Sequence, residues 1–183
     1  MKKVALILAV GFEEIEALTP VDVLRRANIE VTTISITDSK LVTGAHNITI
    51  VTDTTFKESD FNLFDAIILP GGMPGTNNLN AHQELKELLI NFSKNNKLIG
   101  AICAAPLVLG ELGLLKNKSA ICYSGFEQHL IGANLINQSV VKDTNIVTAN
   151  GVGAAMQFAL YLVEELLDAK VAKSIAEKML VSR

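Results

Sequence analysis

Five short apolar segments, widely spaced along the chain, constrain the fold more than any other feature of the sequence. They occupy residues 4–10, 31–36, 66–69, 98–102 and 146–148. Continuous apolar segments of this length are typical of strands that are covered on both faces. Segments with helical periodicity accompany them, at residues 13–27, 83–95, 104–112, 153–167 and 170–180. Strands that alternate with helices predict an α/β fold with a parallel, doubly wound sheet.

Residues 41–53 do not fit this alternation and predict a β-hairpin or edge ribbon carried on the sheet. The chain of 183 residues has the length of one domain, and we find no linker or internal repeat, so we predict a single domain over residues 1–183. Its content of 49% hydrophobic and 19% charged residues excludes an intrinsically disordered chain.

Charge and hydropathy restrict the partners that we expect. The formal net charge is −3 and no run of Lys and Arg exceeds two residues, so we expect neither specific nucleic-acid binding nor attraction to anionic lipids. The apolar segment at residues 4–10 is too short to span a membrane and lacks a signal-peptide cleavage site. We therefore expect a cytoplasmic protein, with Cys103 and Cys122 reduced.

In open α/β sheets, ligands bind beyond the carboxyl ends of the strands. Four loops follow the predicted strands, at residues 11–16, 70–75, 103–106 and 150–153. The functional residues are expected there. The last of these loops contains Asn150 and Gly151, which are expected either to line a pocket or only to pack.

Cys103 directly follows a predicted strand and precedes a predicted helix. Ala101 and Ala105, two positions before and after it, are small enough for the tight turn of a nucleophile elbow. A cysteine at a helix N-terminus is expected to have a lowered pKa, because the helix dipole and backbone N–H groups favour the thiolate. The alternative is an inert core cysteine, since cysteine is common in protein interiors.

The pair Gly71 and Gly72 ends another strand and has two interpretations. It could direct backbone N–H groups into a cavity that binds an oxyanion, or it could form only a tight turn. Glu13 and Glu16 share a helical face after the first strand. Acidic residues in the first turn of a helix interact favourably with the helix dipole, so their presence there does not require a function.

The histidines His46, His82 and His129 have no metal-ligand spacing, so we predict no metal site. Of the three, only His129 follows a predicted strand, at residues 120–123, and this strand could bring it close to Cys103. A Cys–His pair would require that placement. Cys122 lies in the same predicted strand and is expected to be buried.

Five motifs, in this order and at this spacing, resemble the ThiJ/PfpI superfamily, in the branch that contains the bacterial YajL proteins and a human Parkinson-linked protein. The resemblance covers nearly the whole chain and rests on residues 11–16 (GFEEIE), 20–27 (PVDVLRRA), 69–72 (LPGG), 101–106 (AICAAP) and 150–153 (NGVG).

The resemblance implies a flavodoxin-like three-layer α/β/α sandwich and a homodimer without a cofactor. It places the reactive cysteine at Cys103 and a protonated carboxyl at Glu16, which donates a hydrogen bond to the thiolate and steadies the sulfinate formed on oxidation. It assigns an oxyanion-type pocket to the backbone N–H groups of Gly72 and Ala104. Further residues fall near the pocket, in a second layer or at the dimer interface: Glu13, Arg26, Gly71, Tyr123, Asn150 and Gly151.

Tyr123 stands where proteolytic and amidotransferase relatives have a histidine. A thiolate that attacks an amide needs an acid to protonate the leaving amine, so this departure disfavours a protease or a glutaminase. YajL-like members also lack that histidine, so the departure is compatible with this branch.

The function that the resemblance implies is a glutathione-independent glyoxalase, or a deglycase that acts on protein or nucleotide adducts. Its substrates would be small aldehydes such as methylglyoxal, which is converted to lactate. The alternative is an oxidative-stress sensor or chaperone that works through oxidation of Cys103. A third hypothesis is a thiamine-pathway enzyme. The sequence does not support it, because it contains no phosphate-binding loop.

Overall fold

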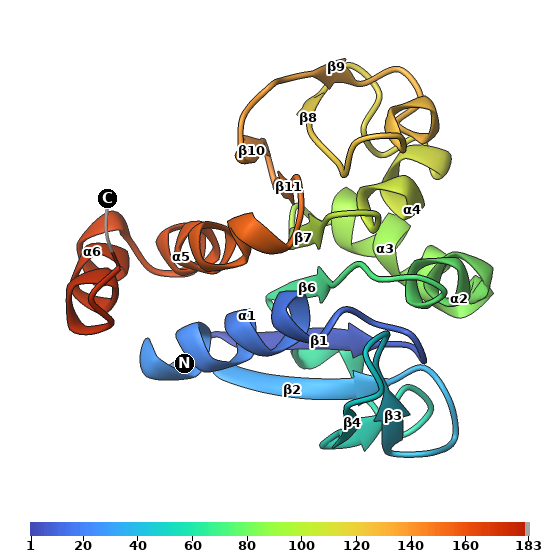
Figure 1. Cartoon of the computed structure of the whole chain (residues 1–183), viewed down its shortest axis with the longest axis horizontal. Helices are drawn as coiled ribbons and strands as arrows, with labels where there is room; N and C mark the ends of the chain where they lie inside the picture. Colours follow the sequence, from blue (N-terminus) through green and yellow to red (C-terminus); the bar gives the residue numbers. More distant parts are fainter. Residues whose placement is uncertain (182–183) are drawn as a thin grey trace.

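The computed structural model describes residues 1–181 and is built around a seven-stranded sheet (Figure 1). β10 alone runs antiparallel to its neighbour β11, and all the other pairs in this sheet are parallel. The strand order is β10 (Val140–Asp143), β11 (Ile146–Ala149), β7 (Leu98–Ile102), β6 (Ala66–Leu69), β1 (Lys3–Leu8), β2 (Glu30–Ser35) and β5 (Thr54–Thr55). The predicted α/β fold with a mostly parallel sheet is confirmed.

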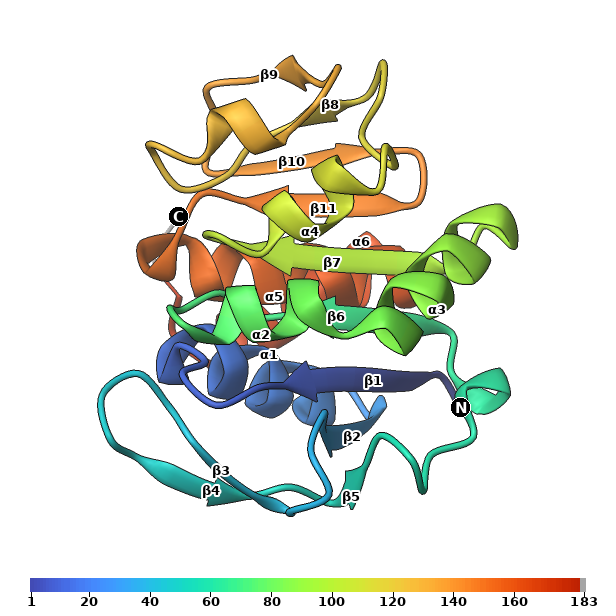
Figure 2. The same cartoon turned by 90° about the vertical axis from the view of Figure 1, so that its right-hand side faces the viewer.

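Helices cover both faces of the sheet, which confirms the three-layer α/β/α arrangement. One face carries α1 (Glu14–Arg26), α5 (Ala155–Leu166) and α6 (Ala169–Lys178). Figure 2 shows the opposite face, with α2 (Gly75–Ala81), α3 (Gln83–Lys94) and α4 (Pro106–Glu111) in front of the strands. Three 3₁₀ helices complete the described helices: η1 (Phe61–Leu63), η2 (Glu127–His129) and η3 (Val152–Ala154).

The central strand β1 explains why the apolar segments do not alternate with polar residues. Leu6 and Leu8 belong to the core cluster beneath α1 and α5, whereas Ala5 and Ile7 belong to the cluster on the opposite face. All four side chains are fully buried. A strand between two layers of helices needs apolar residues at every position, because neither of its faces meets water.

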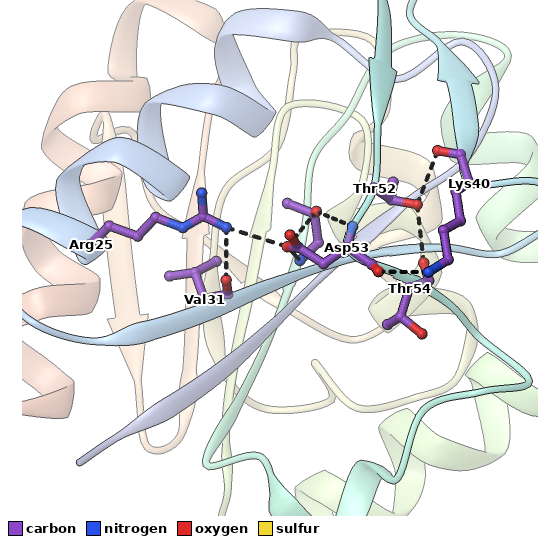
Figure 3. Close-up of polar contacts among 7 residues, drawn as sticks. Arg25, Val31, Lys40, Thr52, Asp53 and Thr54 are labelled. Carbon is purple, nitrogen blue, oxygen red and sulfur yellow. Dashed lines mark hydrogen bonds and ion pairs between the residues drawn. The ribbon is translucent and has the colours of Figure 1, made fainter.

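The predicted hairpin is also confirmed: β3 (Leu41–Thr43) and β4 (Thr49–Val51) pair antiparallel beside the main sheet. Asp53 fixes its base (Figure 3). The Asp53 carboxylate accepts hydrogen bonds from Thr33 N at 2.8 Å and from Arg25 Nη2 at 3.3 Å, and its backbone oxygen accepts one from Lys40 Nζ at 3.0 Å. Arg25 also donates to Val31 O at 2.9 Å, so α1, β2 and the hairpin are joined at one point.

The structure contains elements that the sequence did not predict, among them β5, β10 and α2. α2 was not predicted, because its sequence GTNNLNA offers few apolar residues and no helical stripe. The helix predicted at residues 13–27 is confirmed as α1, which continues through Pro20, and Ala17, Val21 and Leu24 on its buried face hold it to the sheet. The predicted strand at residues 120–123 was wrong, because β8 (Ser119–Ala120) ends at Ala120. It pairs with β9 (Asn134–Leu135) over two residues only, and strands this short leave no pattern in the sequence.

Over residues 1–181, no helix combines the length and the apolar character needed to cross a membrane.

Candidate functional site

The four loops selected from the sequence lie at one edge of the sheet. They follow β1, β6, β7 and β11, which are neighbours in the order β11-β7-β6-β1. The parallel pairings in this order bring the carboxyl ends of the four strands together. Side chains from distant parts of the chain therefore meet at this edge, as expected for an open α/β sheet.

Cys103 occupies a strained turn directly after β7. Its φ angle is 63°, in the left-handed region that residues other than glycine seldom adopt. Its backbone is held on both sides, because Cys103 N donates to Ala149 O at 2.9 Å and Cys103 O accepts from Tyr123 N at 2.7 Å. The turn places a half-buried thiol at the end of the strand, in the manner of a nucleophile elbow.

Glu16, on the first turn of α1, lies beside this thiol. Its side chain is fully buried and Oε2 accepts a hydrogen bond from Gly71 N at 2.9 Å. A Cβ atom at Gly71 would lie 2.7 Å from Glu16 Oε2 and 2.8 Å from Cys103 Cβ. Only glycine fits at this position, so Gly71 is what allows the carboxyl and the thiol to lie side by side.

Burial raises the pKa of Glu16 to about 7, and the negative charge of Glu13 adds to this rise. The neighbouring Cys103 thiol and the N–H of Gly71 act in the opposite direction. Oε1 has no hydrogen-bond partner in the described structure. The free-energy cost of burying an oxygen without a partner is high for an ionised carboxylate and lower for a protonated carboxyl. Glu16 can thus hold or release a proton near neutral pH.

Burial and then the adjacent Glu16 carboxylate raise the pKa of Cys103 to about 12, whereas the N–H groups of Ala104 and Gly72 lower it. The sequence had predicted a lowered pKa. The difference arises because the helix-dipole argument ignored two things: the burial of the thiol, which is the larger cause, and the ionised Glu16 carboxylate, which repels the thiolate. If Glu16 holds the proton, this repulsion disappears. The two groups therefore titrate as a pair.

A hydrogen-bonded cluster adjoins the pair at the start of α1. Glu13 is the N-cap, and its Oε2 accepts from Glu16 N at 2.7 Å. Both oxygens of the buried Glu14 lie 2.7 Å from His46, one from its backbone N and one from Nδ1. Among residues 1–181, these three side chains form the one group of donor atoms close enough for a metal ion, all within 4.8 Å, but their hydrogen bonds already account for the arrangement. Sequence reasoning missed His46, since nothing in the sequence links residue 46 to residue 14.

The structure also places the remaining predicted site residues. The ring of Tyr123 lies against Gly151, where a Cβ atom would be 3.3 Å from Tyr123 Cδ2, and Tyr123 is 52% exposed. Tyr123 lies beside Cys103 through the hydrogen bond from its backbone N to Cys103 O, and Gly151 lies against its ring. Asn150 is exposed, and its backbone N donates to Ser139 O at 3.0 Å.

Two residues lie elsewhere. Arg26 is not in the pocket: it sits ten residues after Glu16, about 15 Å along α1, and its Nε donates to Asp22 Oδ2 at 2.8 Å. His129 Nδ1 lies 2.9 Å from Glu111 Oε1 at the end of α4, so its partner is that carboxylate and no Cys–His pair with Cys103 is observed. The placement of His129 depends on α4, whose contact with residue 129 the order of residues does not specify.

Cys122 is 2% exposed, and burial raises the pKa of its thiol to about 11. We expect iodoacetamide to alkylate Cys122 about 100-fold more slowly in the folded Cys103→Ala variant than in the same variant unfolded in guanidinium, because little thiolate is present or accessible. Peptide mass spectrometry measures both rates. Rapid labelling of Cys122 in the folded protein would show that it is a second reactive thiol.

The fold and the site together define a class: a three-layer α/β protein with a cysteine on a strained turn beside a buried glutamate. Residues 2–165 match the model of the DJ-1/PfpI family, and the chain belongs to this family. The resemblance found from the motifs is confirmed.

The chain is similar to curated proteins over its whole length. It is 35% identical over 183 residues to Protein dj-1beta of Drosophila melanogaster, covering 99% of this chain and 98% of that protein. It is 33% identical to the Parkinson disease protein 7 homolog of Danio rerio, covering 98% and 97%. Among solved structures, the C103A mutant of a DJ-1 superfamily protein from Salmonella typhimurium is 37% identical, with a TM-score of 0.95 and complete coverage of both chains.

Proposed function

We propose that this protein is a cofactor-free enzyme that acts on reactive carbonyl compounds, converting methylglyoxal to lactate and glyoxal to glycolate without glutathione. The observation that carries the proposal is the enclosed pair of Glu16 and Cys103, separated only by Gly71. One group of the pair is a nucleophile, and the other has a pKa of about 7, which suits proton transfer in both directions near neutral pH.

In the proposed reaction, the Cys103 thiolate adds to the aldehyde carbon and the Glu16 carboxyl gives its proton to the resulting oxygen. The N–H groups of Gly72 and Ala104, which act on the sulfur in this structure, would stabilise the developing oxyanion. Glu16, now ionised, takes the hydrogen of that carbon as a proton and delivers it to the neighbouring carbonyl carbon, while the hydroxyl proton of the first carbon passes to the oxygen of the second. The first carbon is oxidised and the second reduced, so no external oxidant is needed. Water then hydrolyses the thioester and releases lactate and the thiol.

Removal of the free aldehyde also lowers the amount of its early adducts on proteins or nucleotides, because these adducts form reversibly. The same activity can therefore be observed as deglycation. Glyoxalase and deglycase are therefore two descriptions that this site supports equally. Thiol chemistry of this kind requires a reducing compartment such as the cytoplasm. We also propose a homodimer, which family membership and the exposed apolar side chains of Ile15 and Leu18 on α1 support.

The proposal predicts saturable formation of lactate from methylglyoxal by the purified protein in the absence of glutathione. Product is measured by an enzymatic lactate assay against a control of buffer with heat-inactivated protein. Adding glutathione is expected to slow the reaction, because it removes free aldehyde as its own hemithioacetal. A rate no higher than the control at millimolar substrate would contradict the proposal.

A second candidate is a redox sensor or chaperone that works through oxidation of Cys103. It is favoured by the same N–H groups and the buried carboxyl, which would also hold a sulfinate. The two candidates separate experimentally. Selective oxidation of Cys103 by mild peroxide, with no turnover of any aldehyde before or after it, would favour the sensor.

A further inference from the structure

The β3–β4 hairpin is fastened to the segment that carries the catalytic glutamate. Gly11 N donates to Thr43 O at 2.8 Å, and Ala45 N donates to Phe12 O at 2.8 Å. His46 completes the contact through Glu14, whose buried carboxylate lies 2.7 Å from both the backbone N and Nδ1 of His46. The turn of the hairpin is thus held directly against the start of α1.

His46 brings a titratable positive charge to this place. It is the one titratable residue of the hairpin (residues 41–51), and residues 70–74, which pack nearby, contain none. Across from it α1 presents Glu14, 2.7 Å from Nδ1, and Glu13, 3.9 Å from Nδ1, with Glu16 behind them. The hydrogen bond and charge of Glu14, and the charge of Glu13, raise the pKa of His46. Because the side chain is 69% exposed, its proton exchanges directly with solvent.

Glu13 connects this cluster to the reactive pair. One of its oxygens accepts from Glu16 N at 2.7 Å, and the other faces His46. The negative charge of Glu13 contributes to the raised pKa of Glu16. A cation beside Glu13 opposes the field of this carboxylate, so the charge at position 46 is felt at Glu16.

We propose that His46 is a positioning residue that, by neutralising Glu13 and Glu14, controls how readily the Glu16–Cys103 pair releases its proton. The inference rests on the proposed roles of that pair, but it concerns the reactivity of the thiol and requires no turnover of an aldehyde. The sign follows from charge: removing the cation leaves the surroundings of the pair more negative, so the pair loses its proton at higher pH.

The test is the pH dependence of Cys103 alkylation by iodoacetamide, followed by peptide mass spectrometry at low ionic strength. We expect His46→Gln to raise the apparent pKa of Cys103 by about 0.3–0.8 pH unit, the size of one screened charge at this range. His46→Lys retains a cation and is expected to stay within about 0.2 unit of the wild-type value. Lys57→Gln is the matched control: it removes a cation that lies 2.7 Å from Asp38, away from the site, and is expected to cause no shift.

Glu13→Gln tests the sign of the effect. It keeps an oxygen for Glu16 N but removes the negative charge, so it should lower the apparent pKa of Cys103, in the direction opposite to His46→Gln. Because the charges of Glu13 and His46 act additively on the pair, His46→Gln should cause a similar rise in the Glu13→Gln background. Equal shifts in His46→Gln and His46→Lys would show that only the anchoring of the hairpin matters and would overturn the inference. A raised apparent pKa of Cys103 in Glu13→Gln would also overturn it. Absence of aldehyde turnover would refute the proposed function, but the pH dependence of Cys103 alkylation could still be measured and would still test the inference.

Discussion

Cys103→Ala is expected to reduce lactate formation from methylglyoxal by on the order of 10³-fold or more, to the level of the uncatalysed reaction. The thiolate forms the covalent bond that starts the proposed reaction. Among the described residues, the groups that act on its sulfur are the N–H donors of Gly72 and Ala104 and the carboxyl of Glu16, and a carboxylate is a much weaker nucleophile than a thiolate. The measurement is the steady-state rate over a range of methylglyoxal concentrations, with circular dichroism to match the folding of the variants.

Cys122→Ala is the matched control, since it makes the same chemical change at the other cysteine. Cys122 is buried in the core cluster on the α3 and α4 side of the sheet, so its loss is expected to cost about 1 kcal/mol of stability and to leave turnover within about twofold. Turnover that survives in Cys103→Ala, or that falls equally in both variants, would rule out Cys103 as the nucleophile.

Glu16→Gln is expected to lower turnover by about 10²–10⁴-fold while Cys103 remains open to alkylation. The glutamine amide keeps an oxygen that can accept from Gly71 N and gains N–H groups that can donate to the sulfur, but it cannot move a proton between two carbon atoms. Loss of turnover with retained alkylation would separate the base from the nucleophile. Retained turnover would show that another group transfers the proton.

Glu16→Gln is also expected to change how the free energy of unfolding depends on pH. The pKa of Glu16 is about 7 in the folded protein and near 4.5 when unfolded, so the folded state binds more protons between these values and the wild type loses stability as pH rises through this window. Glutamine does not ionise. Glu16→Gln is therefore expected to be more stable than the wild type at pH 8, on the order of 1–3 kcal/mol, with a much smaller gain at pH 5, as measured by urea unfolding. An equal gain at both pH values would mean that Glu16 is not ionised by pH 8.

The central sheet could be predicted from the sequence because each of its main strands is buried on both faces. The positions of β1 from Val4 to Leu8 are buried and must then be apolar, and the resulting continuous segments are visible without a structure. α2, β8 and β9 could not be predicted, because two-residue strands and a polar seven-residue helix leave no periodic pattern. Their conformation is set by neighbours that are distant in sequence.

The sequence by itself determined the location of the site: strands that end in Gly71, Gly72 and Cys103 indicate the carboxyl edge of a parallel sheet, and the order of the motifs indicates the family. Only the tertiary structure decided the electrostatics. The pKa of Glu16 depends on its complete burial and on Glu13, and the pKa of Cys103 depends on Glu16, whereas a helix-dipole argument considers one segment alone. His46 shows the same limit. It reaches Glu14 across 32 residues because a hairpin folds back onto α1, and desolvation and Coulomb interactions depend on such distances in space, which the order of residues does not specify.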